Sequence, residues 1–330
     1  MVPLELRLLI KGISTFFPSI TVNSYRIIRN NNVLEADKGR GTDVARYCYS
    51  VWLRHLVMAY ENGMKTFPNS VAELGPGRSL GLGLAALISG SNRYYAFDVI
   101  EQVNSKRNIA ILEDLIELFH NKSDIPGEDE FPQIKPLLKS YNFPSHILTR
   151  SHINNSLRPE RLNLLRNLVR RKNYGHNSIF QIKYSAPWYD SEIVEENSID
   201  MVLSQAVMEH VTNISEAYER LYQWIKPGGF MSHKIDYRSH GNSELWNGHW
   251  TYSDLLWKLI HGRRTFTINR EPHSKHIELT EKMGFNLICN IQDKDYSGIQ
   301  RHQLSDKFAF LSDSDLNTSG SFIQAAKPLS

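Results

Sequence analysis

The sequence predicts an α/β fold with a mostly parallel sheet, helices on both of its faces and an antiparallel strand at one edge. Three observations lead to this prediction. Short apolar strands alternate with helical stretches after residue 67, a glycine-rich turn joins the first strand to a helix of small residues, and the last two strands follow each other with no evident helix between them. With 330 residues, 41% hydrophobic and 22% charged, the chain can bury a core of its own.

Residues 1–66 are expected to form a helical segment that packs on the core. The first twenty residues contain an amphipathic helix whose apolar side carries Leu6, Leu9, Ile10, Ile13 and Phe17. This helix could pack on its own domain, lie on a membrane surface or contact a second subunit. A second helix covers residues 44–64 and ends at Asn62-Gly63, since glycine commonly follows the end of a helix.

Residues 67–102 and 177–330 are expected to form the core, and residues 103–176 a helical insertion. Core strands are predicted in these stretches: 71–74, 94–98, 178–186, 198–205, 230–236, 285–292 and 321–328. The insertion has no convincing core strand, but it contains an amphipathic helix over 108–120 and an arginine-rich helix near 158–172. Long insertions in compact domains are often functional, so we expect this one to form a substrate lid.

The turn after the first strand predicts a cofactor that contains adenosine. Gly75 and Gly77 allow a close backbone approach that a Cβ would prevent, and Asp98 ends the second strand, where a carboxylate can bind both ribose hydroxyls. A dinucleotide site would add a third glycine, but that offset holds Leu80. Glu73 would also repel a pyrophosphate, whereas it would favour a cofactor with a positively charged end.

Three motifs in this order resemble the class I S-adenosylmethionine-dependent methyltransferases. Glu73–Gly77 is similar to the family's first motif, and Asn197–Val211 looks like its fourth-strand motif. Trp224–Asp236 looks like the family's Lys-Pro-Gly-Gly turn with the fifth strand. The resemblance implies a Rossmann-like, doubly wound sheet and S-adenosylmethionine as the cofactor. It also implies that Glu73, Gly75 and Gly77 border the methionine part and that Asp98 binds the ribose.

The same resemblance gives roles to residues after the third and fourth core strands. Ser185 and Ala186 align with the position that contacts adenine, although the family often has an acid where this chain has Ser185. Ser204 and Gln205 would face the methionine end and the methyl group.

Methyl transfer to a hydroxyl needs a group that removes the proton. A histidine with a pKa near neutrality suits this task, and His210 follows the fourth core strand. His233, Asp236 and His240 form a second set of candidates at the end of the fifth. We expect no metal site, because the spacing of His233, Asp236 and His240 is not a recognised ligand pattern and hard cations prefer several carboxylates.

These observations predict an S-adenosylmethionine-dependent methyltransferase that acts on oxygen of a small hydroxylated acceptor, such as a sugar, a glycolipid or a natural product. The acceptor could be anionic, since arginines are frequent in the insertion. It could also be glycosidic, since aromatic residues could stack on a sugar or another flat ring: Tyr47, Tyr49, Trp52, Trp188, Tyr189, Trp246 and Trp250. A net charge of +3 disfavours a nucleic-acid partner. The alternatives are an RNA methyltransferase, a nicotinamide-dependent oxidoreductase and a non-catalytic partner protein of the same fold. Two cysteines without a metal spacing predict a cytoplasmic location, and residues 1–20 leave a peripheral membrane contact open.

Overall fold

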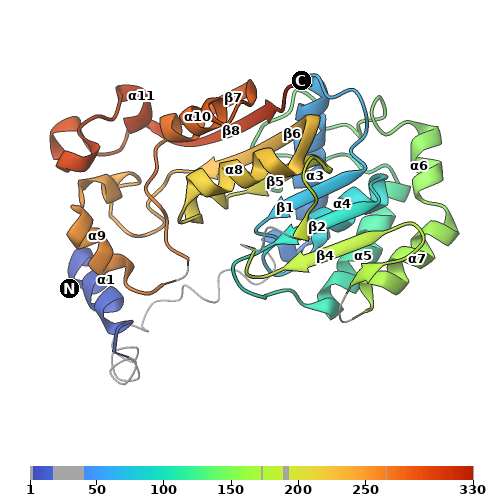
Figure 1. The fold of residues 1–330 in the computed structure, drawn as a ribbon, viewed down its shortest axis with the longest axis horizontal. Coiled ribbons are helices and arrows are strands. Elements are labelled where there is room, and N and C mark those ends of the chain that lie inside the picture. The colour runs from blue at the N-terminus through green and yellow to red at the C-terminus, as the bar shows by residue number, and fades with distance from the viewer. Residues whose placement is uncertain (1–2, 18–40, 172–173, 189–192, 265, 330) are drawn as a thin grey trace.

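The computed structural model describes residues 3–17, 41–171, 174–188, 193–264 and 266–329, and these form one eight-stranded sheet. The strands in chain order are β1 (Ser70–Leu74), β2 (Arg93–Phe97), β3 (Gly175–His176), β4 (Gln181–Ser185), β5 (Ile199–Gln205), β6 (Ile225–Asp236), β7 (Asn286–Lys294) and β8 (Thr318–Ala326). In space the order is β3-β4-β2-β1-β5-β6-β8-β7 (Figure 1). The five strands β4, β2, β1, β5 and β6, which are neighbours in this spatial order, are parallel to one another, whereas β3 and β8 are antiparallel to their neighbours. The predicted Rossmann-like α/β fold, with an antiparallel edge formed by the last two strands, is therefore confirmed, and the short antiparallel strand β3 at the other edge was not predicted.

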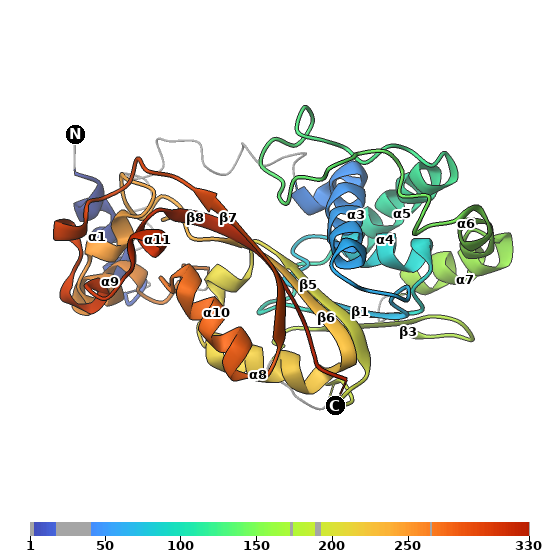
Figure 2. The same ribbon diagram turned by 90° about the horizontal axis from the view of Figure 1, so that it is seen from above.

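Helices cover both faces of the sheet. One layer contains α3 (Ala45–Glu61), α4 (Gly81–Ser89), α5 (Ser105–His120), α6 (Arg150–Ser156) and α7 (Pro159–Val169), and the opposite face carries α8 (Ile214–Trp224) and α10 (His273–Lys282), as Figure 2 shows. The helices of the predicted insertion, α5 to α7, thus lie in the same layer as α3 and α4. A lid function for residues 103–176 stays a prediction.

A small module lies beyond the carboxyl end of β6. It contains α1 (Leu4–Ser14), α9 (Asp254–His261), α11 (Asp313–Leu316) and the short 3-10 helices η4 (Gly248–Thr251), η5 (Arg301–Gln303) and η6 (Asp306–Phe308), and α1 and α9 lie side by side in both views (Figures 1 and 2). Two further 3-10 helices, η1 (Gly41–Asp43) and η3 (Met208–His210), lie near the carboxyl edge of the sheet. Among the described helices, none is long and apolar enough to cross a membrane.

The first helix packs on α9 through a different side from the one predicted. It buries Leu8 and Gly12, and Gly12 lies so close to the backbone of α9 that a Cβ would clash with it. The predicted apolar side remains exposed at Leu6, Ile10, Ile13 and Phe17, while Leu9 packs against the module. Residues 18–20, part of the predicted membrane contact, lie outside the described residues.

A glycine in α4 explains how this helix approaches the sheet. A Cβ at Gly83 would clash with the ring of Tyr94 on β2, so glycine lets the ring lie flat against the helix. This places the Tyr94 hydroxyl 2.5 Å from Oε2 of Glu73 on β1. The small residues of α4 therefore position both strands that lead to the glycine turn.

The Lys-Pro-Gly-Gly stretch does not form a separate turn before the fifth core strand. Residues 226–229 belong to β6, and the pairing with β5 shifts from Ile199–Ile225 to Met201–Phe230. Gly228 has a φ of 78°, which only glycine adopts readily. The stretch is therefore an irregularity inside a longer strand.

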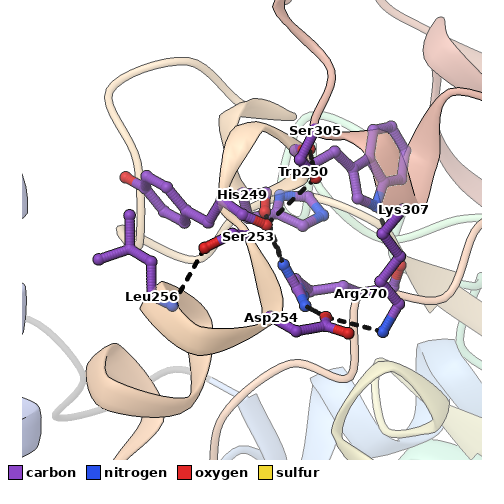
Figure 3. Close-up of polar contacts among 9 residues, drawn as sticks. His249, Trp250, Ser253, Asp254, Leu256, Arg270, Ser305 and Lys307 are labelled. Atoms are coloured by element: carbon purple, nitrogen blue, oxygen red, sulfur yellow. Dashed lines mark hydrogen bonds and ion pairs between the residues drawn. The ribbon is translucent and has the colours of Figure 1, made fainter.

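A buried arginine holds the module together (Figure 3). The Arg270 side chain, on a residue that is 4% exposed, donates to Asp254 Oδ1 at 2.7 Å and to the carbonyl of Tyr252 at 2.8 Å. Lys307 binds the same Asp254 oxygen at 2.9 Å, and the Trp250 indole donates to the Arg270 carbonyl at 2.9 Å. These contacts link α9, η4 and η6.

Candidate functional site

A cavity of about 400 Å³ lies at the carboxyl ends of β1, β2 and β5. The strand order reverses between β1 and β5, and ligands of open α/β sheets bind at such a switch point. The lining comes from the glycine turn, the end of β2, the loop after β5 and the module, and it includes Leu74, Gly75, Gly77, Phe97, Asp98, Val99, Gln102, Trp188, Ala206, Val207, His210, Val211, Thr212, Asn213, Glu216, His261, Arg264 and Phe266. We call it the cofactor cavity. Three predicted cofactor residues, Gly75, Gly77 and Asp98, thus meet in one place.

Both glycines of the turn have backbone conformations that larger residues rarely adopt, and Gly75 also has no room for a side chain. Gly75 has a φ of 66° and Gly77 a φ of 68°, both in the left-handed region. A Cβ at Gly75 would lie 2.5 Å from the side chain of Val207, which itself lines the cavity. The turn is therefore a close-fitting cradle of the kind that an adenosine-containing cofactor requires.

Asp98 presents a buried carboxylate to the cofactor cavity. Asp98 is 6% exposed, and its Oδ1 accepts a hydrogen bond from the amide of Val99 at 2.7 Å. Burial raises the pKa of Asp98, while hydrogen bonds from the backbone of Val99, Gly77 and Ile100 oppose that rise. The carboxylate is thus tied to the glycine turn and placed to accept hydrogen bonds from ribose hydroxyls.

Glu73 is buried beneath the glycine turn, on the side of α4, and is not among the residues that line the cofactor cavity. It is 3% exposed, and burial raises its pKa to about 8 even though the hydrogen bond from Tyr94 acts in the other direction. Strand alternation turns its side chain toward α4, away from the cavity. Its predicted contact with the methionine part stays a prediction.

The predicted adenine contacts lie next to the cavity. Ser185 accepts a hydrogen bond from the amide of Asp98 at 2.9 Å through its carbonyl, and its hydroxyl donates to Pro187 O at 3.1 Å. Neither Ser185 nor Ala186 is a lining residue, whereas Trp188 is. The sequence marks Trp188 only as one of several aromatic residues that could stack on a flat ring, and the structure places it at the cofactor cavity. Tyr189, from the same set, lies outside the described residues.

A second cavity, of about 600 Å³, lies on the other side of the loop after β5. Its lining residues are mostly polar or charged: Tyr47, Gln133, Ile134, Lys135, Gln205, Ala206, Lys234, Asp236, Arg238, Gln292, Asp293, Lys294, Asp295 and Ser319. We call it the polar cavity. Ala206 lines both cavities and has a φ of 55°, which is uncommon for alanine. The predicted residues Gln205 and Asp236 therefore face the polar cavity.

His233 and Ser204 lie inside the protein. Nδ1 of His233 is 2.8 Å from the Ser204 hydroxyl, both side chains are fully buried, and neither residue lines either cavity. Burial, with smaller effects from His55 and His276, lowers the pKa of His233 to about 3. Alternation along β6 turns His233 toward the α8 face, whereas Lys234 reaches the polar cavity. The structure therefore gives His233 no access to a substrate.

Four titratable side chains meet where the two cavities adjoin. His210 lines the cofactor cavity, and its ring lies 5.1 Å from that of His240. Nε2 of His240 is 3.4 Å from Oδ2 of Asp236, and the Glu209 carboxylate lies close to both histidines. The sequence predicts His210, His240 and Asp236 near the reaction, and Glu209 stands beside His210 in the same candidate stretch after the fourth core strand.

The two histidines have different electrostatic surroundings. Burial lowers the pKa of His210, and the charge of His240 lowers it further. Burial also acts to lower the pKa of His240, but the hydrogen bond with Asp236 and the charges of Asp236 and Glu209 outweigh it, so the net shift is upward. His210 is therefore the imidazole of the pair with the lower pKa.

Residues 155–232 match a family model described as a methyltransferase domain. This match starts after the glycine turn and includes β4, β5, η3, α8 and part of β6. A search of curated proteins finds no match.

Solved structures with a similar chain path include several S-adenosylmethionine-dependent methyltransferases. One from Methanosarcina mazei is 10% identical, covering 82% of this chain and 98% of its own, with a TM-score of 0.42. Another, from Mesorhizobium loti, is 11% identical and covers 87% and 100%, with a TM-score of 0.39. A phosphoethanolamine N-methyltransferase from Haemonchus contortus, in complex with S-adenosyl-L-methionine, is 14% identical and covers 91% and 61%, with a TM-score of 0.39.

Proposed function

We propose that this chain, whose class I S-adenosylmethionine-dependent methyltransferase domain holds the cofactor cavity, methylates a hydroxyl group of a small hydroxylated acceptor such as a sugar, a glycolipid or a natural product. The observation that supports this acceptor class is the polar cavity, which adjoins the cofactor cavity at Ala206. Its lining offers donors from Lys234 and Arg238 and acceptors from Asp236 and Asp293. A molecule with many hydroxyls can use both kinds of partner at once.

The chain's own residues divide the work between the cavities. Gly75, Gly77 and Asp98 would hold the cofactor. When bound, S-adenosylmethionine supplies an electrophilic methyl carbon, which bonds to the acceptor oxygen while the electrons of the carbon–sulfur bond return to sulfur. One imidazole of the pair His210 and His240, which lies where the two cavities adjoin, accepts the proton of the hydroxyl.

The RNA alternative receives little support from the arginine-rich helix α7. Arg161 donates to the carbonyl of Leu87 at 3.0 Å, and Arg166 pairs with Glu113 at 2.8 Å. These two side chains tie α7 to α4 and α5. They are therefore not part of a basic stripe that could follow a phosphate backbone.

Release of S-adenosylhomocysteine in the presence of sugars, glycolipids and hydroxylated natural products tests the proposal. We expect turnover with at least one of these acceptors. Because Asp236→Asn removes a charged hydrogen-bond partner of the acceptor, it should lower kcat/KM for that acceptor by about 10-fold or more. Binding of S-adenosylhomocysteine should not change in this variant. Asp114→Asn, an exposed change on α5, is the matched control.

Two outcomes would contradict the proposal. One is methylation of nitrogen or of RNA, with no product from hydroxylated molecules. The other is full acceptor turnover by Asp236→Asn.

A further inference from the structure

We propose that Glu209, His210 and His240 bind one divalent transition-metal ion at the junction of the two cavities. One ligand atom from each of these residues can be chosen so that the atoms lie within 4.8 Å of one another. The expectation of no metal site considered His233 with Asp236 and His240. The structure separates His233 from this group and brings in Glu209 and His210.

The fold brings the three side chains together and fixes them. η3 follows β5, and His240 follows β6, and the carboxyl ends of these adjacent parallel strands meet at one edge. The Asn269 amide donates to the Glu209 carbonyl at 2.7 Å, and the Asn269 side chain donates to Met208 O at 2.8 Å. His240 itself has a φ of 49°, a conformation that a non-glycine residue keeps only where its surroundings enforce it.

The carboxylate of Glu209 needs a partner that its protein surroundings do not supply. Glu209 is 3% exposed, and neither of its oxygens accepts a hydrogen bond from another described residue. Burial raises its pKa to about 8. Burying a carboxyl group without hydrogen bonds costs several kcal/mol, whereas coordination to a cation satisfies both the charge and the lone pairs.

The two histidines complete a ligand set typical of transition metals. Nδ1 of His210 is buried and has no hydrogen-bond partner among the described residues. His240 is held by Asp236, and a carboxylate bonded to one imidazole nitrogen is the usual outer partner of a metal-bound histidine. Two imidazoles and one carboxylate suit Mn²⁺, Fe²⁺, Co²⁺ or Zn²⁺ better than Mg²⁺ or Ca²⁺.

The position of the ion suggests its use. His210 lines the cofactor cavity, while Asp236, which holds His240, lines the polar cavity. An acceptor hydroxyl coordinated there would have a lower pKa and would lose its proton to solvent, because both histidines would then bind the ion instead of accepting the proton. This role rests on the proposed function, whereas binding of the ion does not.

Titration of EDTA-treated protein with Co²⁺, followed by calorimetry and visible absorption, tests the site. We expect one Co²⁺ per chain with ligand-field bands, and at least about 10-fold weaker binding in Glu209→Gln and in the positioning variant Asp236→Asn. The control His302→Gln removes an exposed histidine and should bind Co²⁺ as the wild type does.

Binding of S-adenosylhomocysteine checks that each variant is folded. If Glu209→Gln fails this check, His240→Asn gives the same test at a partly exposed side chain. The proposal is overturned if the wild type shows no stoichiometric Co²⁺ site, or if a folded ligand variant binds Co²⁺ as tightly as the wild type. Because no acceptor is present, a failure to methylate hydroxyls would leave this result unaffected.

Discussion

The two halves of the sheet, on either side of β5, are built in different ways. In the half formed by β4, β2 and β1, the strands bury mainly apolar and aromatic side chains, and the residues that line the cofactor cavity stand at strand ends. In the half formed by β6, β8 and β7, polar side chains such as Ser232, His233, Ser321 and Gln324 are buried within the strands. A polar residue at a strand end is thus a good candidate for function, whereas one inside a strand here serves the fold.

A hydrogen-bond network accounts for most polar groups inside the second half. Nδ1 of His55 on α3 lies 2.7 Å from the Ser232 hydroxyl, and Gln324 donates to the same oxygen at 2.9 Å. Asn62 in turn donates to Gln324 at 2.9 Å. Buried polar groups that are paired in this way define one arrangement of the strands, and removing one partner leaves another unpaired.

The largest expected difference between the two halves is that the second half makes the folded protein less stable at low pH. His55, His233, His249 and His276 are buried in or around the second half, and burial lowers their pKa values from 6.5 to about 4 for His55 and about 3 for the others. Below pH 6.5 the unfolded chain binds protons that the folded chain does not, so stability is full above this pH and falls toward the lower pKa values. Each histidine contributes up to about 1.4 kcal/mol per pH unit, or about 5.5 kcal/mol per pH unit for four. Glu73 and Glu209, whose pKa values burial raises to about 8, act in the opposite direction below that pH, so the expected net loss is about 3 kcal/mol per pH unit.

Urea unfolding between pH 7 and about pH 5 measures this slope. His233→Gln should reduce it by about 1.4 kcal/mol per pH unit, while His302→Gln, at an exposed position, should leave it unchanged. A free energy of unfolding that stays constant over this range would contradict the account of the second half.

A smaller effect is expected at the module attached to the second half. Arg270→Lys keeps the charge but loses the forked geometry that reaches both Asp254 and the carbonyl of Tyr252. It also weakens stacking on Trp257 and Phe308, whose ring centroids lie 4.8 and 4.9 Å from the guanidinium carbon. We expect a loss of about 2–4 kcal/mol in the free energy of unfolding, measured by urea titration.

A matched arginine defines the control for this prediction. Arg46→Lys changes an exposed arginine that pairs with Glu130 and should cost less than about 1 kcal/mol. Equal losses in the two variants would show that Arg270 does not organise the module.

The sequence predicted the first half of the sheet more fully than the second. Strand and helix order, the glycine turn and Asp98 follow from local patterns, because glycine conformations and strand ends are local properties. The role of His233 could not be read in the same way, since the direction of its side chain depends on the pairing of β6 with β8. The cluster of Glu209 with His240 also depends on contact between two loops, in which these residues are 31 positions apart in the sequence.

Calorimetric titration tests whether the glycine turn and Asp98 hold S-adenosylmethionine. We predict that the wild type binds S-adenosylmethionine and S-adenosylhomocysteine in the micromolar range and does not bind NAD. Loss of two hydrogen bonds to a charged group predicts at least about 100-fold weaker binding in Asp98→Ala, with Asp114→Asn unchanged. Binding of NAD in preference to S-adenosylhomocysteine, or undiminished binding by Asp98→Ala, would contradict this cofactor assignment.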